Sequence, residues 1–318
     1  MLGSMTASRW TAADIPDQTG RTFVITGANS GLGFVMTREL ARRGASVVMA
    51  VRDLSKGERA RAEITAAVPD ARLDLRALDL ADLDSVRAFA AQLDAFDVLV
   101  NNAGVMMPPR RLSPQGHESQ FACNHLGHFA LTGLLFPAVR ARVVTLSSTM
   151  HRRGRIRFDD LTGAHGYSPT AFYAQSKFAN VLFGLELDRR LRAAAHPVRS
   201  LLAHPGYSAT NLQLSGPTGL ARGFMRLGNR VVAQHVDRGV LPQLYAATAA
   251  AAEGGQFIGP DGFAETRGYP TVVRPVRSAE DPEVARRLWA LSEELTGVRF
   301  PALDPAPDRA PGSASSGR

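Results

Sequence analysis

Features that would mark a secreted or membrane protein are scarce in this sequence of 318 residues. The one cysteine, Cys123, cannot form a disulfide within the chain, which fits a reducing compartment, and we expect a cytoplasmic protein. No stretch approaches the ~20 consecutive apolar residues of a membrane span, so we expect none. Residues 1–17 lack the apolar centre of a signal peptide, and residues 305–318 are rich in Pro, Ala, Gly and Ser. We expect both to be disordered.

The motifs of several other enzyme classes are also missing. The sequence has neither the G-x-x-x-x-G-K-[ST] loop of P-loop proteins nor the G-x-S-x-G elbow of α/β-hydrolases. His117 and Glu118 are not followed by the second histidine of a zinc protease. His125 and His128 are spaced to share a helix face, but no Cys or carboxylate ligand set accompanies them, so we expect no metal site.

The charge of the chain is positive, with 37 Lys and Arg against 29 Asp and Glu. The Arg residues are scattered, and there is no basic arm or run of like charge, so we expect no nucleic-acid partner. Part of the positive potential is expected to serve an anionic cofactor.

Short apolar runs typical of strands alternate with longer stretches typical of helices. This alternation predicts a Rossmann-type, doubly wound α/β fold with a parallel sheet covered on both faces. We expect a single domain over residues 18–304, with a small variable substrate lobe at about 208–240. The predicted strands are 22–26, 46–51, 73–78, 97–100, 142–146, 198–203 and 256–258. The clearest predicted helices are 32–43, 83–93 and 172–191.

A glycine-rich turn joins the first predicted strand to the first predicted helix. Gly27 permits a tight turn, Gly31 a close approach of the backbone to a pyrophosphate, and Gly33 close packing of helix on strand. The helix start also offers free N–H groups and a partial positive charge to an anion. The spacing differs from G-x-G-x-x-G, so an ordinary βα turn remains the alternative. The residues expected to contact a dinucleotide here are Gly27, Asn29, Ser30, Gly31, Leu32 and Gly33.

Arg52 follows the second strand, where the cofactor's ribose is recognised. An acidic residue at that point holds the 2′-hydroxyl of NAD, whereas an Arg suits the 2′-phosphate of NADP. Arg52 therefore favours NADP(H) over NAD(H). Two alternatives stay open: Asp53 points inward and binds a hydroxyl, or both residues are solvated loop residues.

The ends of the third and fourth strands complete the predicted cofactor edge, because ligands bind at the carboxyl ends of strands in open α/β sheets. Asp79 is a candidate acceptor for the adenine amino group, and Leu80 lies beside it. Asn102 is expected to brace the loops, and Gly104, after Ala103, to let the cofactor lie close.

Tyr173 and Lys177 are four residues apart on the predicted helix 172–191, so they share a face. A phenol has a pKa near 10, and a nearby ammonium lowers it. A tyrosine tuned in this way exchanges a proton with a carbonyl or alcohol oxygen. Lys177 can also hydrogen-bond the nicotinamide ribose. By itself the pair equally fits an exposed helix surface.

Further polar groups are expected near this pair. Ser148, with Ser147 as the alternative, ends the fifth strand, where its hydroxyl can hold the substrate oxygen beside Tyr173. Asn124 lies in a helix-type segment, where its side chain can hold a water against a disturbed helix backbone. That water would link Lys177 to solvent as a proton path.

Taken together, these motifs resemble the short-chain dehydrogenase/reductase family over roughly residues 19–298. The matching residues are Thr26-Gly27-x-x-x-Gly31-x-Gly33, Asn101-Asn102-Ala103-Gly104, Asn124, Ser148 and Tyr173-x-x-x-Lys177. The segment Pro205-Gly206, with Ser208 and Thr210, is similar to the family's loop that closes over the nicotinamide. The phrases Val51-Arg52-Asp53, Asn124-His125-Leu126-Gly127-His128-Phe129 and Ser176-Lys177-Phe178-Ala179-Asn180 resemble the retinol-dehydrogenase-like branch.

The resemblance implies hydride transfer between a nicotinamide and a carbonyl or alcohol. It implies Tyr173 as acid/base, Lys177 as its tuner, Ser148 as holder of the substrate oxygen and Asn124 as relay. It further implies a lipophilic small-molecule substrate and a homodimer or homotetramer. A protein of another class, an NADP(H)-binding regulator that keeps the fold without turnover, is the alternative function.

Overall fold

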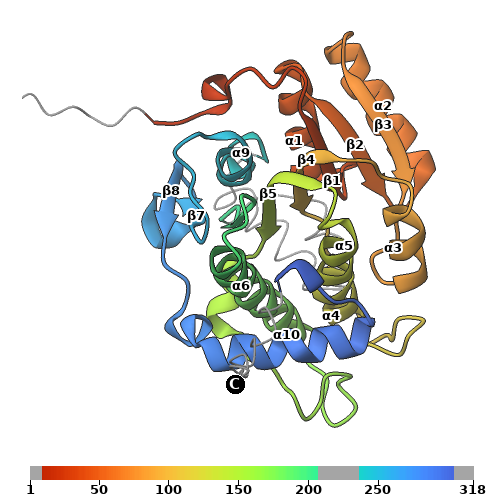
Figure 1. Cartoon of the computed structure of the whole chain (residues 1–318), viewed down its shortest axis with the longest axis vertical. Helices are drawn as coiled ribbons and strands as arrows, with labels where there is room; N and C mark the ends of the chain where they lie inside the picture. The colour runs from red at the N-terminus through yellow and green to blue at the C-terminus, as the bar shows by residue number, and fades with distance from the viewer. Residues whose placement is uncertain (1–8, 207–235, 304–318) are drawn as a thin grey trace, which may run out of the picture.

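The computed structural model describes residues 9–206 and 236–303 of the chain (Figure 1). Eight strands form one sheet in the order β3-β2-β1-β4-β5-β6-β7-β8, parallel except for the last pair. The strands are β1 Thr22–Thr26, β2 Ser46–Val51, β3 Arg72–Ala77, β4 Phe96–Asn101, β5 Val139–Leu146, β6 Arg199–Ala203, β7 Phe257–Pro260 and β8 Pro270–Val273. The predicted Rossmann-type α/β fold is confirmed.

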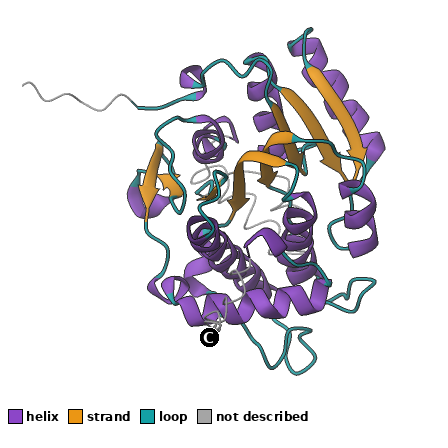
Figure 2. Ribbon diagram, in the orientation of Figure 1, coloured by secondary structure: helices purple, strands orange, loops and turns teal. Residues whose placement is uncertain are grey.

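Helices cover both faces of this sheet (Figure 2). The α-helices are α1 Gly31–Arg42, α2 Leu54–Ala67, α3 Leu83–Ala90, α4 Ser119–Phe121, α5 Gly127–Leu135, α6 Pro169–Ala193, α8 Val236–Gly239, α9 Leu241–Thr248 and α10 Pro282–Thr296. Short turns of other helix types are η1 Ala12–Asp14, η2 Ala122–Leu126, η3 Thr149–Arg153, η5 Phe263–Glu265, η6 Arg277–Glu280 and η7 Pro301–Leu303.

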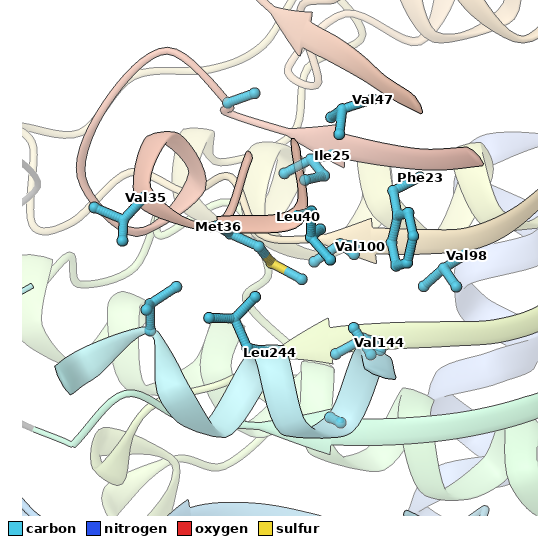
Figure 3. Close-up of a cluster of buried hydrophobic side chains, with 14 of the residues drawn as sticks. Phe23, Ile25, Val35, Met36, Leu40, Val47, Val98, Val100, Val144 and Leu244 are labelled. Atoms are coloured by element: carbon cyan, nitrogen blue, oxygen red, sulfur yellow. The ribbon is translucent and has the colours of Figure 1, made fainter. Parts of the chain in front are cut away.

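The core has two layers because neighbouring strand residues point to opposite faces. Phe23 and Ile25 of β1 pack with α1, α2 and α9, and Figure 3 shows this layer with Met36 and Leu244 against the sheet. Val24, between them, points into the second layer, beneath α3, α5, α6 and α10. Burial on both faces explains why the central strands are almost continuously apolar.

The sheet order reverses at β1, whose neighbours are β2 and β4. In an open α/β sheet the crevice outside the carboxyl ends of the strands at such a reversal is where ligands bind. The glycine turn after β1 and the loop after β4 therefore lie at the expected binding edge.

Most predicted elements agree with the structure within a few residues, and two differences have clear causes. Helix α6 begins at Pro169, three residues before the predicted start, since Ser168 caps it by accepting a hydrogen bond from the Ala171 N–H. Strand β8 was not predicted because it is a four-residue edge strand that begins with a proline.

The N-terminal prediction is wrong for residues 9–17, which were expected to belong to a disordered leader. Ile15 is buried, and the ring of Trp10 meets Tyr245 of α9 edge-on at 5.3 Å between centroids. These two side chains, together with hydrogen bonds from the Arg43 guanidinium to the Ala12 and Ala13 carbonyls, dock this stretch. The remaining disorder predictions, and most of the predicted substrate lobe at 208–240, lie outside the described residues. Across the described ranges, no helix is both long and apolar enough to cross a membrane.

Candidate active site

The turn after β1 has the backbone that its glycines permit. Gly27 and Gly31 have φ values of +68° and +54°, in the left-handed region that disfavours other residues. A Cβ on Gly33 would lie 2.4 Å from the Gly27 carbonyl oxygen and 2.6 Å from Asn102 Nδ2. Gly33 thus has the close packing that the sequence predicts.

The first turn of α1 is free to bind an anion. Ser30 is the N-cap residue, but its side chain makes no capping hydrogen bond. The first backbone bond of the turn is donated by the Phe34 N–H to the Ser30 carbonyl. Among the described residues, no acceptor takes the N–H groups of Gly31, Leu32 and Gly33. An anion placed here would meet these donors and the positive end of the helix dipole.

Thr26 holds the two loops of this edge together, a role that the sequence did not reveal. Its Oγ1 accepts hydrogen bonds from the N–H groups of Asn102 and Ala103, both at 2.9 Å. Asn102 Nδ2 donates to the Thr26 carbonyl at 2.7 Å, as expected for a bracing residue. The loop after β4 is therefore fixed against the glycine turn at three points.

Arg52 and Asp53 separate into different roles. The Asp53 carboxylate caps α2 by accepting a hydrogen bond from the Lys56 N–H at 3.0 Å, and it pairs with Lys56 Nζ at 3.3 Å. These hydrogen bonds hold the pKa of Asp53 below its usual range. Arg52 is exposed, and no other described residue makes an ion pair or hydrogen bond with its side chain. Asp53 is committed to the helix, whereas Arg52 is available to a ligand.

Asp79 and Leu80 lie at the end of β3. Asp79 Oδ1 accepts a hydrogen bond from the Ala81 N–H at 3.0 Å. Leu80 is buried, and its carbonyl lies so close to α5 that a Cβ on Gly127 would be 2.1 Å from the oxygen. Leu80 is thus a packing residue, and Asp79 has one carboxylate oxygen bound within its own turn.

Ser148, Tyr173 and Lys177 come together at the carboxyl end of β5. Tyr173 and Lys177, one turn apart on α6, are 5% and 4% exposed, so the exposed-surface alternative is wrong. Lys177 Nζ lies 5.8 Å from the centroid of the Tyr173 ring, and the Ser148 side chain lies near enough to the phenol to oppose a rise in its pKa.

The two serines at the end of β5 have distinct partners. Ser147 is buried, and its hydroxyl donates to the Lys177 carbonyl at 2.8 Å, which ties β5 to α6. Ser148 is half-buried and faces Tyr173. Of the two, only the Ser148 hydroxyl is placed to meet a substrate oxygen beside the phenol.

Burial, rather than the neighbouring ammonium, dominates the acidity of the pair. It raises the pKa of Tyr173 to about 12, although the nearby Ser148 side chain opposes the shift. The expectation of a lowered tyrosine pKa is therefore not met in the protein alone. Burial also lowers the pKa of Lys177 to about 8. Near neutral pH the site holds a neutral phenol beside an ammonium.

Asn124 lies within a π-type turn, η2, so the predicted disturbance of the helix backbone is present. Its amide Nδ2 donates to the Val105 carbonyl and to Ser176 Oγ, both at 2.9 Å, and its Oδ1 accepts from the Val105 N–H at 2.8 Å. The side chain thus clamps the loop after β4 to α6. Its service as a proton relay stays a prediction.

Gly104 lets that loop pass close to the lysine. A Cβ there would be 3.1 Å from Asn124 Oδ1 and 3.6 Å from Lys177 Nζ.

His128 connects the glycine turn to Asn124, which sequence reasoning missed. Its Nδ1 lies 3.0 Å from the Asn124 carbonyl and its Nε2 lies 2.9 Å from Thr26 Oγ1. Burial lowers the pKa of His128 to about 4, so the ring is neutral. His125 belongs to another network, through Ser292 at 2.9 Å. In the described part of the chain, no three metal-ligating side chains gather.

Pro205 and Gly206 follow β6 at the same edge of the sheet. Gly206 has a φ of +67° and donates its N–H to His204 Nδ1 at 3.2 Å. Ser208 and Thr210, the other predicted members of this segment, lie outside the described residues.

Known proteins resemble the chain over most of its length. The sequence model of the family described as short chain dehydrogenase matches residues 21–221. Retinol dehydrogenase 13 of Homo sapiens is 39% identical over 302 residues, covering 91% of this chain and 88% of that protein. Polyprenol dehydrogenase of Mus musculus is 40% identical over 298 residues, covering 89% and 86%.

Solved structures share the fold. A crystal structure of an uncharacterised protein from Mycobacterium paratuberculosis is 49% identical, with a TM-score of 0.79, and the match covers 92% of this chain and all of that one. A short chain dehydrogenase from Burkholderia cenocepacia, solved in complex with NADP, is 20% identical with a TM-score of 0.59, covering 76% and 96%.

Proposed function

The chain belongs to the short-chain dehydrogenase family, in its retinol-dehydrogenase-like branch, and we propose that Tyr173 moves the proton when hydride passes between NADP(H) and its substrate. Members of this family are oxidoreductases that act on alcohol and carbonyl groups, and so is this protein. The observation that carries the proposal is the buried pair of Tyr173 and Lys177, with the half-buried Ser148, beside the open first turn of α1.

In the reducing direction, the chain's own groups handle the oxygen of the substrate. When bound, the cofactor supplies the hydride to the carbonyl carbon. Ser148 donates a hydrogen bond to the carbonyl oxygen, and Tyr173 gives it the phenol proton, so that an alcohol and a phenolate result. Lys177, as an ammonium, stabilises that phenolate until a proton from solvent restores the phenol. A neutral phenol near pH 7 suits this direction.

Three observations support NADP(H) as the cofactor. The uncapped N-terminus of α1 fits a pyrophosphate. Arg52 is exposed and unpaired among the described residues, which suits a 2′-phosphate. Asp53, the residue that would otherwise favour NAD, caps α2. The solved relative in complex with NADP is consistent with the same preference.

The substrate is proposed to be a lipophilic small alcohol or carbonyl compound. The names of two relatives, retinol dehydrogenase and polyprenol dehydrogenase, support this class. We further propose that the protein works in the reducing direction and in the cytoplasm. Its proposed oligomeric state is a homodimer or homotetramer.

The test is turnover of lipophilic aldehydes, ketones and secondary alcohols by the purified protein, with NADP(H) and NAD(H), followed through the absorbance of the reduced nicotinamide. We expect substrate-dependent oxidation of NADPH, faster than that of NADH. Tight binding of NADPH without turnover of any compound in the panel would contradict the proposal and favour a silent regulator.

A further inference from the structure

The turn between β7 and β8 has an unusual backbone beside the candidate active site. Ala264, with φ +50° and ψ +29°, and Glu265, with φ +55°, are consecutive left-handed residues, and neither is glycine. This conformation costs free energy at each residue and persists only where surrounding contacts enforce it. On this turn, the side chain of Glu265 makes such contacts.

The Glu265 carboxylate connects two segments that lie far away in the sequence. Its Oε2 is 3.0 Å from His204 Nε2, and its Oε1 accepts a hydrogen bond from the Arg152 guanidinium. The side chain is only 19% exposed, and that of His204 is fully buried. Because both side chains are sheltered, the contact with His204 is stronger than one at an open surface, whereas Arg152 is 47% exposed.

The contact with His204 extends to the segment of Pro205 and Gly206. His204 Nδ1 accepts the Gly206 N–H at 3.2 Å, so the ring proton is on Nε2 and is donated to Glu265. The two backbones also touch, since a Cβ on Gly206 would lie 2.5 Å from the Thr266 carbonyl oxygen. Glu265 thus fixes the histidine ring that supports Gly206.

The contact with Arg152 extends to Ser148. Arg152 lies in η3, and Ser148 is the N-cap residue of that turn. Within η3, His151 Nδ1 donates to the Ser148 carbonyl at 2.7 Å, and the His151 N–H does so at 2.9 Å. A shift of η3 would therefore move the Ser148 hydroxyl relative to Tyr173.

We propose that Glu265 is a positioning residue that fixes the Ser148 turn and the Pro205–Gly206 segment in relation to each other. Its value for turnover rests on the proposed function, in which Ser148 holds the substrate oxygen, and on the family resemblance, by which Pro205–Gly206 closes over the nicotinamide. The Glu265 carboxylate reaches the Ser148 turn through Arg152 and the Pro205–Gly206 segment through His204.

The test compares Glu265→Ala, Glu265→Gln and Phe263→Ala. Phe263 lies on the same turn and is 91% exposed, so it controls for alteration of the turn itself. We expect Glu265→Ala to lower kcat on the order of tenfold to a hundredfold, the cost of misplacing reacting groups by a fraction of an ångström to an ångström. Its Kd for NADPH should change about threefold or less, because the glycine turn is untouched. Glu265→Gln keeps an oxygen that accepts from His204 but loses the charge that pairs with Arg152. Its kcat should therefore lie between those of the wild type and Glu265→Ala.

Two readouts decide the result. Wild-type kcat in folded Glu265→Ala, or an equal loss of kcat in Phe263→Ala, would overturn the proposal. Hydrogen exchange of the Gly206 and His151 amides needs no substrate. It should quicken in Glu265→Ala at both amides, and unchanged exchange at either one would also overturn the proposal. If the wild-type protein turns over no substrate, the proposed function fails while this exchange test still stands.

Discussion

Replacing Gly33 by alanine should weaken cofactor binding through a steric clash alone. Gly33 is the third residue of α1 and has an ordinary helical backbone, so alanine would favour the helix by about 1 kcal/mol if space allowed. The added Cβ would instead lie 2.4 Å from the Gly27 carbonyl oxygen, whereas a close carbon–oxygen contact is about 3.3 Å. The turn must therefore move by roughly 0.9 Å, the difference between these two distances.

That movement cannot be absorbed by a flexible side chain. The second clash, 2.6 Å to Asn102 Nδ2, meets an amide already bound to the Thr26 carbonyl at 2.7 Å. Loss of one hydrogen bond to a charged pyrophosphate is worth about 1.5–3 kcal/mol. We expect the Kd for NADPH to rise on the order of tenfold to a hundredfold. The free energy of unfolding should fall by about 1–3 kcal/mol, as for other overpacked sites.

The assay is a fluorescence titration with NADPH together with urea unfolding. Gly116→Ala is the control, because a Cβ added at that glycine would have nothing within 4 Å, and Gly116 lies away from the turn. Its Kd should match the wild type even though its φ of +83° makes alanine strained. Wild-type affinity in Gly33→Ala would refute the reasoning, because the contact distances leave no room for it.

Three further predictions concern the chemistry and the cofactor. Ser148→Ala should lower kcat, whereas Ser147→Ala should act mainly on stability and lower the free energy of unfolding by about 1 kcal/mol through loss of its bond to α6; equal kcat losses in the two variants would contradict the assignment. Arg52→Ala should raise the Kd for NADPH by roughly tenfold and leave that for NADH unchanged, and a parallel rise for both would argue against 2′-phosphate binding. Burial lowers the pKa of Lys177 to about 8 from an ordinary 10.5. Between these two pH values the folded protein binds fewer protons at Lys177 than the unfolded chain does. The contribution of Lys177 to the free energy of unfolding should therefore increase as pH rises from about 8 to 10.5. Over the same rise the ammonium is lost, so reductive turnover should fall, and a profile that stays flat through pH 8 would contradict its role.

The sheet was predictable because its central strands are buried on both faces and therefore apolar. Strands β1 and β2 begin and end at the predicted residues. Strand β8 pairs only with β7 and exposes Val272, so its sequence carried no such signal. The motifs of the site were likewise predictable, because glycine turns and the Tyr–Lys pair depend on local spacing.

Local spacing in the sequence does not determine which of two adjacent residues faces the site. It also does not determine which residues far apart in the sequence come into contact. The sequence left open whether Ser147 or Ser148 faces Tyr173, and only the direction of each side chain at the end of β5 decides it. Burial raises the pKa of Tyr173, whereas the sequence predicted a lowered pKa. Burial is a property of the packed fold. Glu265 meets Arg152 across 113 residues, and no periodic pattern links such positions.

The most direct test of the account is Tyr173→Phe, measured for both NADPH affinity and turnover. Because we propose the phenol as the proton donor, we expect turnover to fall on the order of a hundredfold to ten-thousandfold while the Kd for NADPH stays within about twofold. Tyr245→Phe, whose ring packs on Trp10 well away from α6, is the matched control and should retain wild-type turnover. Turnover of Tyr173→Phe within about tenfold of the wild type would contradict the central claim.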